Sequence, residues 1–296
     1  MTLARFSKAG ENGRLVLAIP SKGRMAQPAL ELCSAAGLRF EAGERALHVP
    51  CANAPVDLLL VRPHDIPEYV QDGVVHAGIT GANLVVESGA GVVSLARLGF
   101  ARCTLEAAVP SDAPQRELTE LDGLRIATAY PVTTRTALER LGIRADLVTV
   151  SGSVEAAPRL GLSHAVVDLV STGSTLEANG LRRVGCLLES EAVLITGNGT
   201  ADERPETLER LELMLRGVVA ARRRRYVMMN ASEHALPEIA SLLPSMGAPS
   251  VVPLATRGEI AVHAAVDVDD IWDLLPRLKL AGATSILVVP LERVVA

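Results

Sequence analysis

Short apolar runs alternate with amphipathic segments over the first two thirds of the chain. The runs are of strand length and end at Gly, Pro or polar residues; they are 14–20, 56–61, 74–79, 105–109, 125–129, 147–150 and 165–170. Helical periodicity follows several of them, at 28–36, 68–71 and 135–141. This order of strand and helix predicts an α/β fold with largely parallel sheets.

A different pattern begins at Tyr226. A helix predicted at 205–224 precedes this pattern. One apolar face of the helix is formed by Leu208, Leu211, Leu215 and Val218. The pattern itself consists of a strand (226–230), a helix (233–243), two strands (250–255 and 259–265), a helix (269–280) and a strand (285–291). This βαββαβ order predicts a ferredoxin-like C-terminal domain.

Composition narrows the class of protein. In 296 residues, 49% are hydrophobic but only 2% are aromatic, and the formal net charge is −5. An acidic chain with so few aromatic side chains is not expected to bind nucleic acid. No apolar run is long enough for a membrane span, and the first residues lack the apolar core of a signal peptide. Four cysteines without C-x-x-C spacing are typical of a reduced compartment, so we expect a cytoplasmic protein.

The stretch from 165 to 176 carries the strongest chemical signal. Asp168 stands inside a predicted buried strand, where an acid is costly unless it is paired or faces a ligand. Five residues rich in hydroxyl groups follow, Ser171-Thr172-Gly173-Ser174-Thr175, before a predicted helix. Such a segment can bind phosphate through backbone N–H and hydroxyl donors, but it can also simply cap the helix. The segment alone leaves both interpretations open.

Basic residues follow two of the other predicted strands. Lys22 and Arg24 stand in a Gly-containing turn after the first strand, and Arg62 follows the strand at 56–61. Ligands of α/β proteins bind at the carboxyl ends of strands, so these cations are candidates for anion binding. The alternatives are solvated surface charges for Lys22 and Arg24, and an ion pair with Asp65 for Arg62.

The spacing of the central stretch is similar to the signature of the ATP phosphoribosyltransferase family. The matching residues are Glu155, Gly161, Ser163, Val166, Asp168, Leu169, Thr172, Gly173, Thr175 and Leu176. The C-terminal G-A-T-S-I-L-V-V-P-L-E also resembles the family, so the resemblance extends from Arg14 to the end. It implies a two-lobed catalytic part with a periplasmic-binding-protein-like fold, joined to a regulatory domain that binds histidine in the long form of the family. The implied limits are 1–108 with 187–221 for lobe I, 109–186 for lobe II, and 222–296 for the ferredoxin-like domain.

The resemblance also implies a reaction and its ligands. N1 of ATP displaces pyrophosphate from 5-phosphoribosyl pyrophosphate (PRPP) to give N1-(5-phosphoribosyl)-ATP, the first step of histidine biosynthesis. Histidine is the expected feedback inhibitor and Mg²⁺ the expected cofactor, with no confident side-chain metal ligand. A homo-oligomer, dimer or hexamer, is the expected assembly.

Roles for individual residues follow from the same resemblance. The resemblance implies that Asp168 binds the ribose hydroxyls and that Lys22, Arg24 and Arg62 bind pyrophosphate or triphosphate. It implies that the 5-phosphate is bound by Ser171, Thr172, Gly173, Ser174 and Thr175. Further substrate candidates are Glu155, Arg135 and Tyr130, and candidates for the effector site are Ser250, Gly282, Ala283, Thr284 and Ser285. The chain departs from the family at His76 and Asn83, where acids are expected, so no substrate role is assigned to them.

Two other functions are compatible with the sequence. One is a non-catalytic cytosolic sensor made of a two-lobed small-molecule binder and an amino-acid-binding module. The other is a type I PRPP-using phosphoribosyltransferase, because the acid-x-x-x-T-G-x-T spacing from Asp168 to Thr175 also occurs there. Enzymes of that type usually carry adjacent acids, whereas Val167 precedes Asp168 here.

Overall fold

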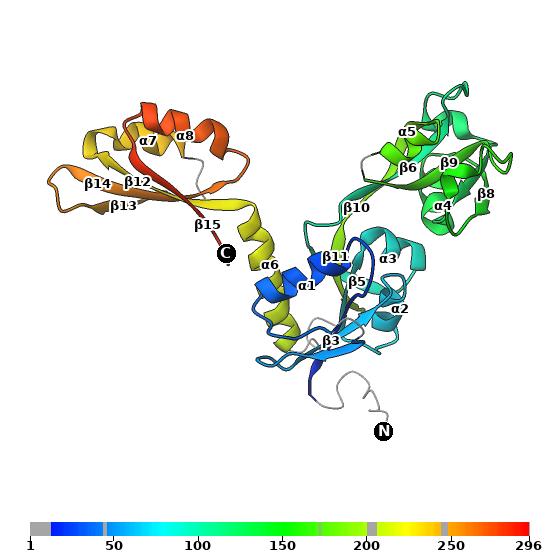
Figure 1. Cartoon of the computed structure of the whole chain (residues 1–296), viewed down its shortest axis with the longest axis horizontal. Coiled ribbons are helices and arrows are strands. Elements are labelled where there is room, and N and C mark those ends of the chain that lie inside the picture. Colours follow the sequence, from blue (N-terminus) through cyan, green and yellow to red (C-terminus); the bar gives the residue numbers. More distant parts are fainter. Residues whose placement is uncertain (1–12, 44–45, 172, 200–205, 244–247, 296) are drawn as a thin grey trace. The chain divides into compact units, whose positions relative to one another are not determined.

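The computed structural model describes residues 13–43, 46–171, 173–199, 206–243 and 248–295. The chain divides into two compact units (Figure 1). The first comprises Met1–Ser34 with Leu38–Glu212, and the second Ala35–Gly37 with Leu213–Ala296. The first unit contains two β-sheets and the second contains one.

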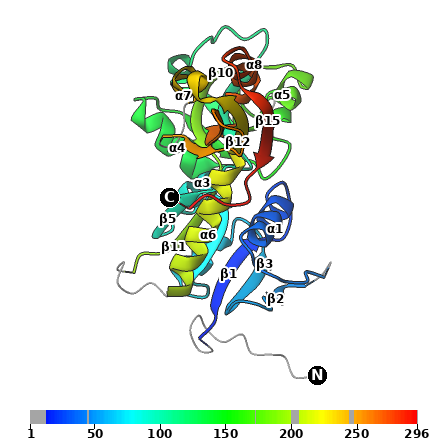
Figure 2. The same cartoon turned by 90° about the vertical axis from the view of Figure 1, so that its left-hand side faces the viewer.

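The first sheet has six strands in the order β2-β3-β1-β4-β11-β5. Their bounds are Leu15–Pro20 (β1), His48–Pro50 (β2), Val56–Val61 (β3), Ala77–Gly81 (β4), Val92–Arg97 (β5) and Ala192–Gly197 (β11). β1 pairs in parallel with β3 and β4, whereas β2 and β11 run antiparallel to their neighbours (Figure 2). The apolar runs of β1 and β3 are buried, as expected for central parallel strands.

Helices connect the parallel strands of this sheet. They are α1 (Ala26–Ala35), α2 (Ile66–Gln71) and α3 (Ala82–Ser88). Helix α2 packs closely on β4 because Gly78 has no side chain: a Cβ there would lie 2.3 Å from Cγ2 of Ile66. Ile66 and Val70 thereby join a core cluster with Ala18 of β1. The predicted α/β alternation is therefore confirmed for this part of the chain.

The second sheet has five strands in the order β10-β6-β9-β7-β8. Their bounds are Cys103–Pro110 (β6), Arg125–Thr128 (β7), Asp146–Thr149 (β8), Ala165–Val170 (β9) and Leu181–Ser190 (β10). β7 pairs in parallel with β8 and β9, and β6 lies antiparallel between β9 and β10. The helices are α4 (Pro131–Arg140) and α5 (Ser174–Ala178), with 3-10 turns at Leu118–Leu121 and Val154–Ala156.

The chain passes twice between these sheets. The first passage is 98–102, between β5 and β6, and the second is Glu191, between β10 and β11. Two sheets joined by two crossings are the arrangement of a periplasmic-binding-protein-like fold, as predicted. The expected lobe limits at 108/109 and 186/187 fall inside β6 and β10 rather than at the crossings, and the domain limits themselves stay a prediction.

The turn around 153–161 differs from a regular helix. Pro158 falls beyond the first turn of any helix that begins at Val154, where a proline interrupts regular helical hydrogen bonds. The structure has a single 3-10 turn, Val154–Ala156, and Ser153 before it has a left-handed backbone (φ 49°) without a side-chain cap.

The second unit is a ferredoxin-like domain, as the C-terminal pattern predicted. Helix α6 (Glu206–Arg222) leads into its sheet, and the apolar face of this helix is buried as expected. Its elements are β12 (Arg224–Ser232), α7 (Leu236–Leu242), β13 (Ser250–Pro253), β14 (Glu259–Asp267), α8 (Ile271–Leu280) and β15 (Thr284–Pro290). The strands are antiparallel in the order β13-β14-β12-β15, and α7 and α8 cover one face of this sheet (Figure 1).

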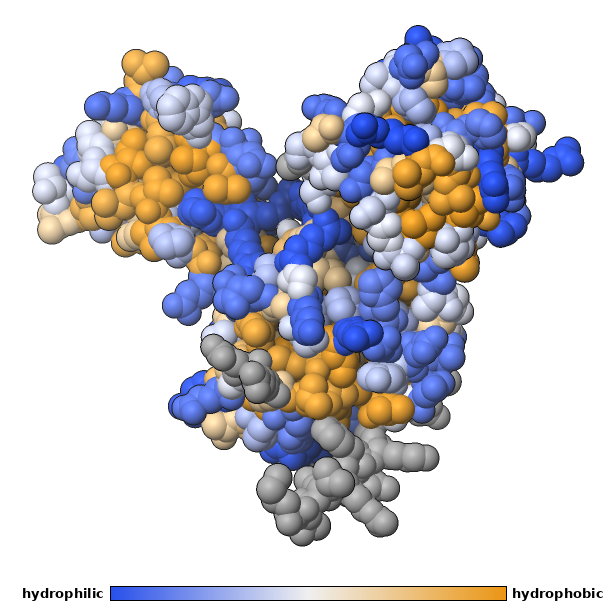
Figure 3. Space-filling view, turned by 45° about the vertical axis from the view of Figure 1, so that its right-hand side comes forward, coloured by the Kyte–Doolittle hydropathy of each residue, from blue (hydrophilic) through white to orange (hydrophobic). Residues whose placement is uncertain are grey.

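Apolar side chains also remain on the surface. They gather in patches on the face of the molecule that Figure 3 displays. In the second unit the edge strand β15 leaves Leu287 and Val289 exposed, and the other edge strand, β13, leaves Val251 and Val252 exposed. On strands β12 and β14, buried side chains alternate with half-buried ones, as expected where helices pack on one face of the sheet.

Candidate functional site

Strand β9 and the segment after it form a cavity at one end of the second sheet. Gly173 has a left-handed backbone (φ 89°), which turns the chain into α5. The cavity, called the loop cavity below, has a volume of about 360 Å³. It is lined by Glu155, Asp168, Leu169, Val170, Ser171, Gly173, Thr175 and Leu176. The predicted ribose and phosphate residues thus share one cavity, apart from Ser174, which is exposed outside it, and Thr172, which lies outside the described residues.

The loop cavity is acidic. Burial raises the pKa of Asp168; the hydrogen bond that its Oδ1 accepts from the Leu169 N–H (2.7 Å) opposes this, and Glu155 adds to it. Among the described residues, the lining includes two carboxylates and no Lys or Arg. Partly desolvated carboxylates of this kind accept hydrogen bonds strongly, as the hydroxyl groups of a sugar would require.

A second cavity lies between the two sheets of the first unit and has a volume of about 170 Å³. It is lined by Lys22, Gly23, Arg24, Met25, Pro63, His64, Gly81, Asn83, Leu84, Ala101, Tyr130 and Leu169. This cleft cavity adjoins the loop cavity, because Leu169 lines both and Nη1 of Arg24 donates a hydrogen bond to Oγ of Ser171 (2.7 Å). The predicted basic turn therefore meets the predicted phosphate segment.

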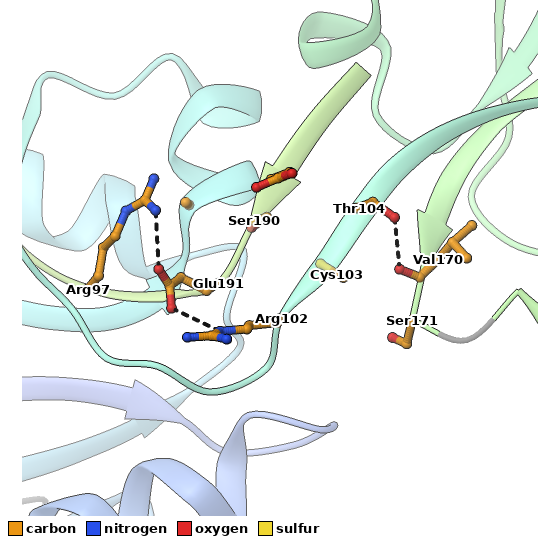
Figure 4. Close-up of a pocket in the computed structure, with 10 residues that line it drawn as sticks. Arg97, Arg102, Cys103, Thr104, Val170, Ser171, Ser190 and Glu191 are labelled. Carbon is orange, nitrogen blue, oxygen red and sulfur yellow. Dashed lines mark hydrogen bonds and ion pairs between the residues drawn. The ribbon is translucent and has the colours of Figure 1, made fainter. Parts of the chain in front are cut away.

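A third cavity, of about 400 Å³, lies where the chain crosses between the sheets (Figure 4). Glu191 stands between two arginines there, with its carboxylate 3.4 Å from Nη1 of Arg97 and 3.7 Å from Nε of Arg102. Ser171 lies across from these side chains and also lines the loop cavity. Neither Arg97 nor Arg102 follows a predicted strand in a recognisable turn, so the sequence alone does not indicate either arginine as a site residue.

Comparison with known proteins identifies the family. The profile described as ATP phosphoribosyltransferase matches residues 62–217, and that described as HisG, C-terminal domain, matches residues 221–293. The chain belongs to the ATP phosphoribosyltransferase family. Membership makes it an enzyme, a pentosyltransferase, and its reaction is the first step of histidine biosynthesis. The alternative of a non-catalytic sensor is therefore wrong.

Named relatives cover nearly the whole chain. ATP phosphoribosyltransferase of Maricaulis maris is 41% identical over 292 residues, 96% of this chain and 99% of the relative. The enzyme of Bacteroides thetaiotaomicron is 37% identical over 281 residues, 95% of this chain and 99% of the relative. Among solved structures, the ATP phosphoribosyl transferase (HisG:HisZ) complex from Thermotoga maritima matches with a TM-score of 0.58 and 26% identity, covering 68% of this chain and 98% of that one.

Other predicted substrate residues are spread around the ATP phosphoribosyltransferase cleft. Tyr130 lines the cleft cavity, and burial raises the pKa of its hydroxyl, with the Asp168 carboxylate adding to the effect. Arg62 and Arg135 are exposed and line none of the three cavities, although Pro63 and His64 beside Arg62 line the cleft cavity. The structure thus brings most of the predicted site together, with Arg62 and Arg135 outside it.

His76 and Asn83, where the resemblance implies acids, both have structural contacts. Nδ1 of His76 accepts a hydrogen bond from the Val16 N–H (2.9 Å), at the end of β4 away from the turn that lines the cleft cavity. Burial lowers the pKa of His76, which suits this acceptor role. Asn83 lines the cleft cavity, but its Oδ1 accepts from Oγ of Ser190 (2.8 Å), and Ser190 in turn accepts from the Asn83 N–H (3.0 Å).

No group of three or more His, Cys, Asp or Glu side chains placed to hold a metal occurs in the described part of the chain. No helix within the described residues is long and apolar enough to cross a membrane.

The residues predicted for the effector site do not lie together in the second unit. Ser250 begins β13, whereas Thr284 and Ser285 begin β15 at the opposite edge of the sheet. Gly282 has a left-handed backbone (φ 96°) after α8, and Ala283 is buried in the core of the domain. Within one copy of the chain, this set forms two separate locations.

Proposed function

We propose that this chain transfers the phosphoribosyl group of PRPP to N1 of ATP in the cleft formed by the loop and cleft cavities. The observation that carries the proposal is the shared cavity: Asp168, Ser171 and Thr175 line one volume in a chain of the ATP phosphoribosyltransferase family. A half-buried acid beside hydroxyl donors complements the two ends of a ribose 5-phosphate, its ring hydroxyls and its phosphate.

The 5-phosphate lies against the segment 171–175. Ser171 and Thr175 supply hydroxyl donors, and Gly173 lets the backbone approach the phosphate closely because it has no side chain. Thr172 and Ser174 are assigned to the same phosphate by their spacing. Asp168 and Glu155 then accept hydrogen bonds from the ribose hydroxyls, which orients C1 toward the cleft cavity.

The basic turn covers the leaving group and the nucleotide. Lys22 and Arg24 line the cleft cavity, and Arg24 already reaches Ser171, so we assign both to pyrophosphate or triphosphate oxygens. Arg62 belongs to the same group by its position at the end of β3, although its side chain is exposed. Tyr130 lies where it can contact the adenine, and Arg135 has a peripheral role at most.

The residues of the site fit a magnesium ion held by pyrophosphate oxygens and water, with at most one or two carboxylates. When bound with PRPP, Mg²⁺ offsets part of the pyrophosphate charge. The protein's own task is alignment, because the attacking N1 carries no proton and requires no general base. Holding two reactants in a reactive geometry can lower a barrier by about 7–11 kcal/mol.

The ferredoxin-like unit is proposed to bind histidine and inhibit the reaction. The support is the match of residues 221–293 to the family's C-terminal domain and the fold predicted for it. Linkage then requires that histidine weakens substrate binding and that substrates weaken histidine binding by the same factor. We further propose a homo-oligomer and a cytoplasmic location, in line with the sequence expectations.

The direct test is product formation. Mixing the purified chain with ATP, PRPP and Mg²⁺ should increase absorbance as the N1-adduct forms, and histidine should slow the increase. Omission of PRPP is the control for any other reaction of ATP. Absence of product in the complete mixture, from protein that is folded by circular dichroism, would overturn the proposal.

A further inference from the structure

The proposed phosphate subsite lacks a positive charge in its own lining. Among the described lining residues of the loop cavity, the only charged ones are Asp168 and Glu155. A phosphate monoester adds between one and two negative charges at neutral pH. Three anionic groups close together repel one another in a partly desolvated site. A cation next to the cavity would offset this repulsion and strengthen the binding that the backbone and hydroxyl donors of the segment provide, and this inference rests on the proposed function.

Strand β10 places an arginine beside the segment. Nη2, Nε and Cζ of Arg183 lie 3.6, 3.7 and 3.5 Å from the point that a Cβ on Gly173 would occupy. The guanidinium thus lies next to Gly173, whose backbone is left-handed, at the distance at which it would contact a side chain placed there. Arg183 is exposed, and within the described part of the chain no carboxylate pairs with it.

The adjacent arginine shows that this placement is specific. Arg182 points to the other side of β10, as alternation along a strand requires, and its Nη2 donates to the carbonyl oxygens of Ala113 (3.2 Å) and Gln115 (2.6 Å). Arg24, the other cation at the segment, donates to Ser171 and lines the cleft cavity. Arg183 is therefore the arginine whose guanidinium remains available beside Gly173.

We propose that Arg183 is the counter-cation of the PRPP 5-phosphate. A guanidinium offers several N–H donors in a plane that matches phosphate oxygens, and it keeps its charge at every physiological pH. It does not touch the reacting C1 or N1, so its effect is on the binding of PRPP. It thereby makes the site selective for a phosphorylated sugar over one without the phosphate.

Steady-state kinetics of the full-length enzyme test this role. Arg183→Gln should raise the KM for PRPP and the inhibition constant of ribose 5-phosphate by about tenfold, which corresponds to about 1.4 kcal/mol. The kcat and the KM for ATP should stay within about twofold of wild type. Arg183→Lys, which keeps the charge, should give an intermediate KM for PRPP. The matched control is Arg140→Gln, which removes an exposed arginine of α4 that lines none of the three cavities.

Two results would overturn the assignment. One is a KM for PRPP within about twofold of wild type in Arg183→Gln, and the other is an equal increase in Arg140→Gln, which would indicate a general charge effect. If Arg183→Gln lowers the melting temperature, Arg183→Lys decides: a KM for PRPP between those of wild type and Arg183→Gln supports the charge role, and a KM equal to that of Arg183→Gln overturns it. Thr175→Val, assayed in parallel, separates the two proposals: weaker PRPP binding there with no effect at Arg183 leaves the proposed function standing.

Discussion

The carboxylate of Glu87 holds Thr133 by two hydrogen bonds: Oε2 accepts from the Thr133 N–H at 2.8 Å and from its hydroxyl at 2.7 Å. Oε1 also accepts from the N–H of Val132 at 3.1 Å. Glu87 is on α3, beside the first sheet, and Thr133 is in the first turn of α4, beside the second. The acid therefore caps a helix of one lobe from a helix of the other, next to Tyr130 in the cleft cavity.

Loss of this contact should destabilise the first unit. Glu87→Ala removes the acceptor for the N–H groups of Val132 and Thr133, and the loss of a helix cap typically lowers the free energy of unfolding by about 1–2 kcal/mol. Urea denaturation measures the change. Glu139→Ala, which removes an exposed acid from the same α4, should change stability by less than about 0.5 kcal/mol. Equal stability of the Glu87 variant and wild type would show that the contact contributes nothing.

Substitution of Asp168 should impair turnover. Asp168→Asn keeps the size of the side chain and an oxygen for the Leu169 N–H, but it loses the charge that accepts hydrogen bonds from the ribose hydroxyls. We expect at least a tenfold lower kcat/KM for PRPP, which is about 1.4 kcal/mol of transition-state stabilisation. The initial rate of the absorbance assay checks this. A variant with wild-type kinetics would remove Asp168 from the site.

The same substitution should stabilise the fold at neutral pH. Burial raises the pKa of Asp168 above its ordinary value of 3.8, so between 3.8 and the raised pKa the folded protein binds more protons than the unfolded chain. Stability therefore falls as the pH rises through this window, and the penalty of the buried charge is complete above it. Asp168→Asn should melt at a higher temperature than wild type at pH 7, and the difference should vanish below about pH 3.8. A difference that does not depend on pH would argue against a charge effect.

Substitution of Thr175 should weaken PRPP binding with little effect on the fold. Thr175→Val removes the hydroxyl that lines the loop cavity, while the backbone carbonyl that accepts from Nδ2 of Asn179 (2.9 Å) is unchanged. The expected result is at least a tenfold loss of kcat/KM for PRPP, about 1.4 kcal/mol. Thr149→Val, an exposed position at the end of β8, is the control and should keep wild-type kinetics.

Removal of the ferredoxin-like unit should separate catalysis from inhibition. A chain shortened by residues 222–296 should retain part of the activity, because all residues assigned to the cleft precede the deletion. It should no longer respond to histidine. The assay with and without histidine, together with the oligomeric state of both proteins by gel filtration, checks the expectation. Full inhibition of the shortened chain would place the histidine site in the first unit.

The sequence by itself predicted many of the strands, the order of elements in the C-terminal unit, and the chemistry of the stretch from 165 to 176. Apolar runs with the right length and boundaries predicted β1, β3, β6, β7 and β9, and the order of elements after Tyr226 predicted the ferredoxin-like unit. The grouping of Asp168 with Ser171, Gly173 and Thr175 could also be predicted, because these residues are neighbours in the chain and need no long-range contact to share a cavity. Local spacing decides such features.

Contacts between distant segments were decided only by the tertiary structure. Arg183 lies beside Gly173 because β10 pairs with β6 and passes next to α5, and a shift of one residue along β10 would place Arg182 there instead. Glu87 reaches Thr133 because two helices from different sheets pack together. Ser250 and Ser285 fall at opposite edges because the strand order of the sheet differs from the order along the chain. Register and strand order depend on pairing energies summed over whole sheets, and no local pattern of residues contains that information.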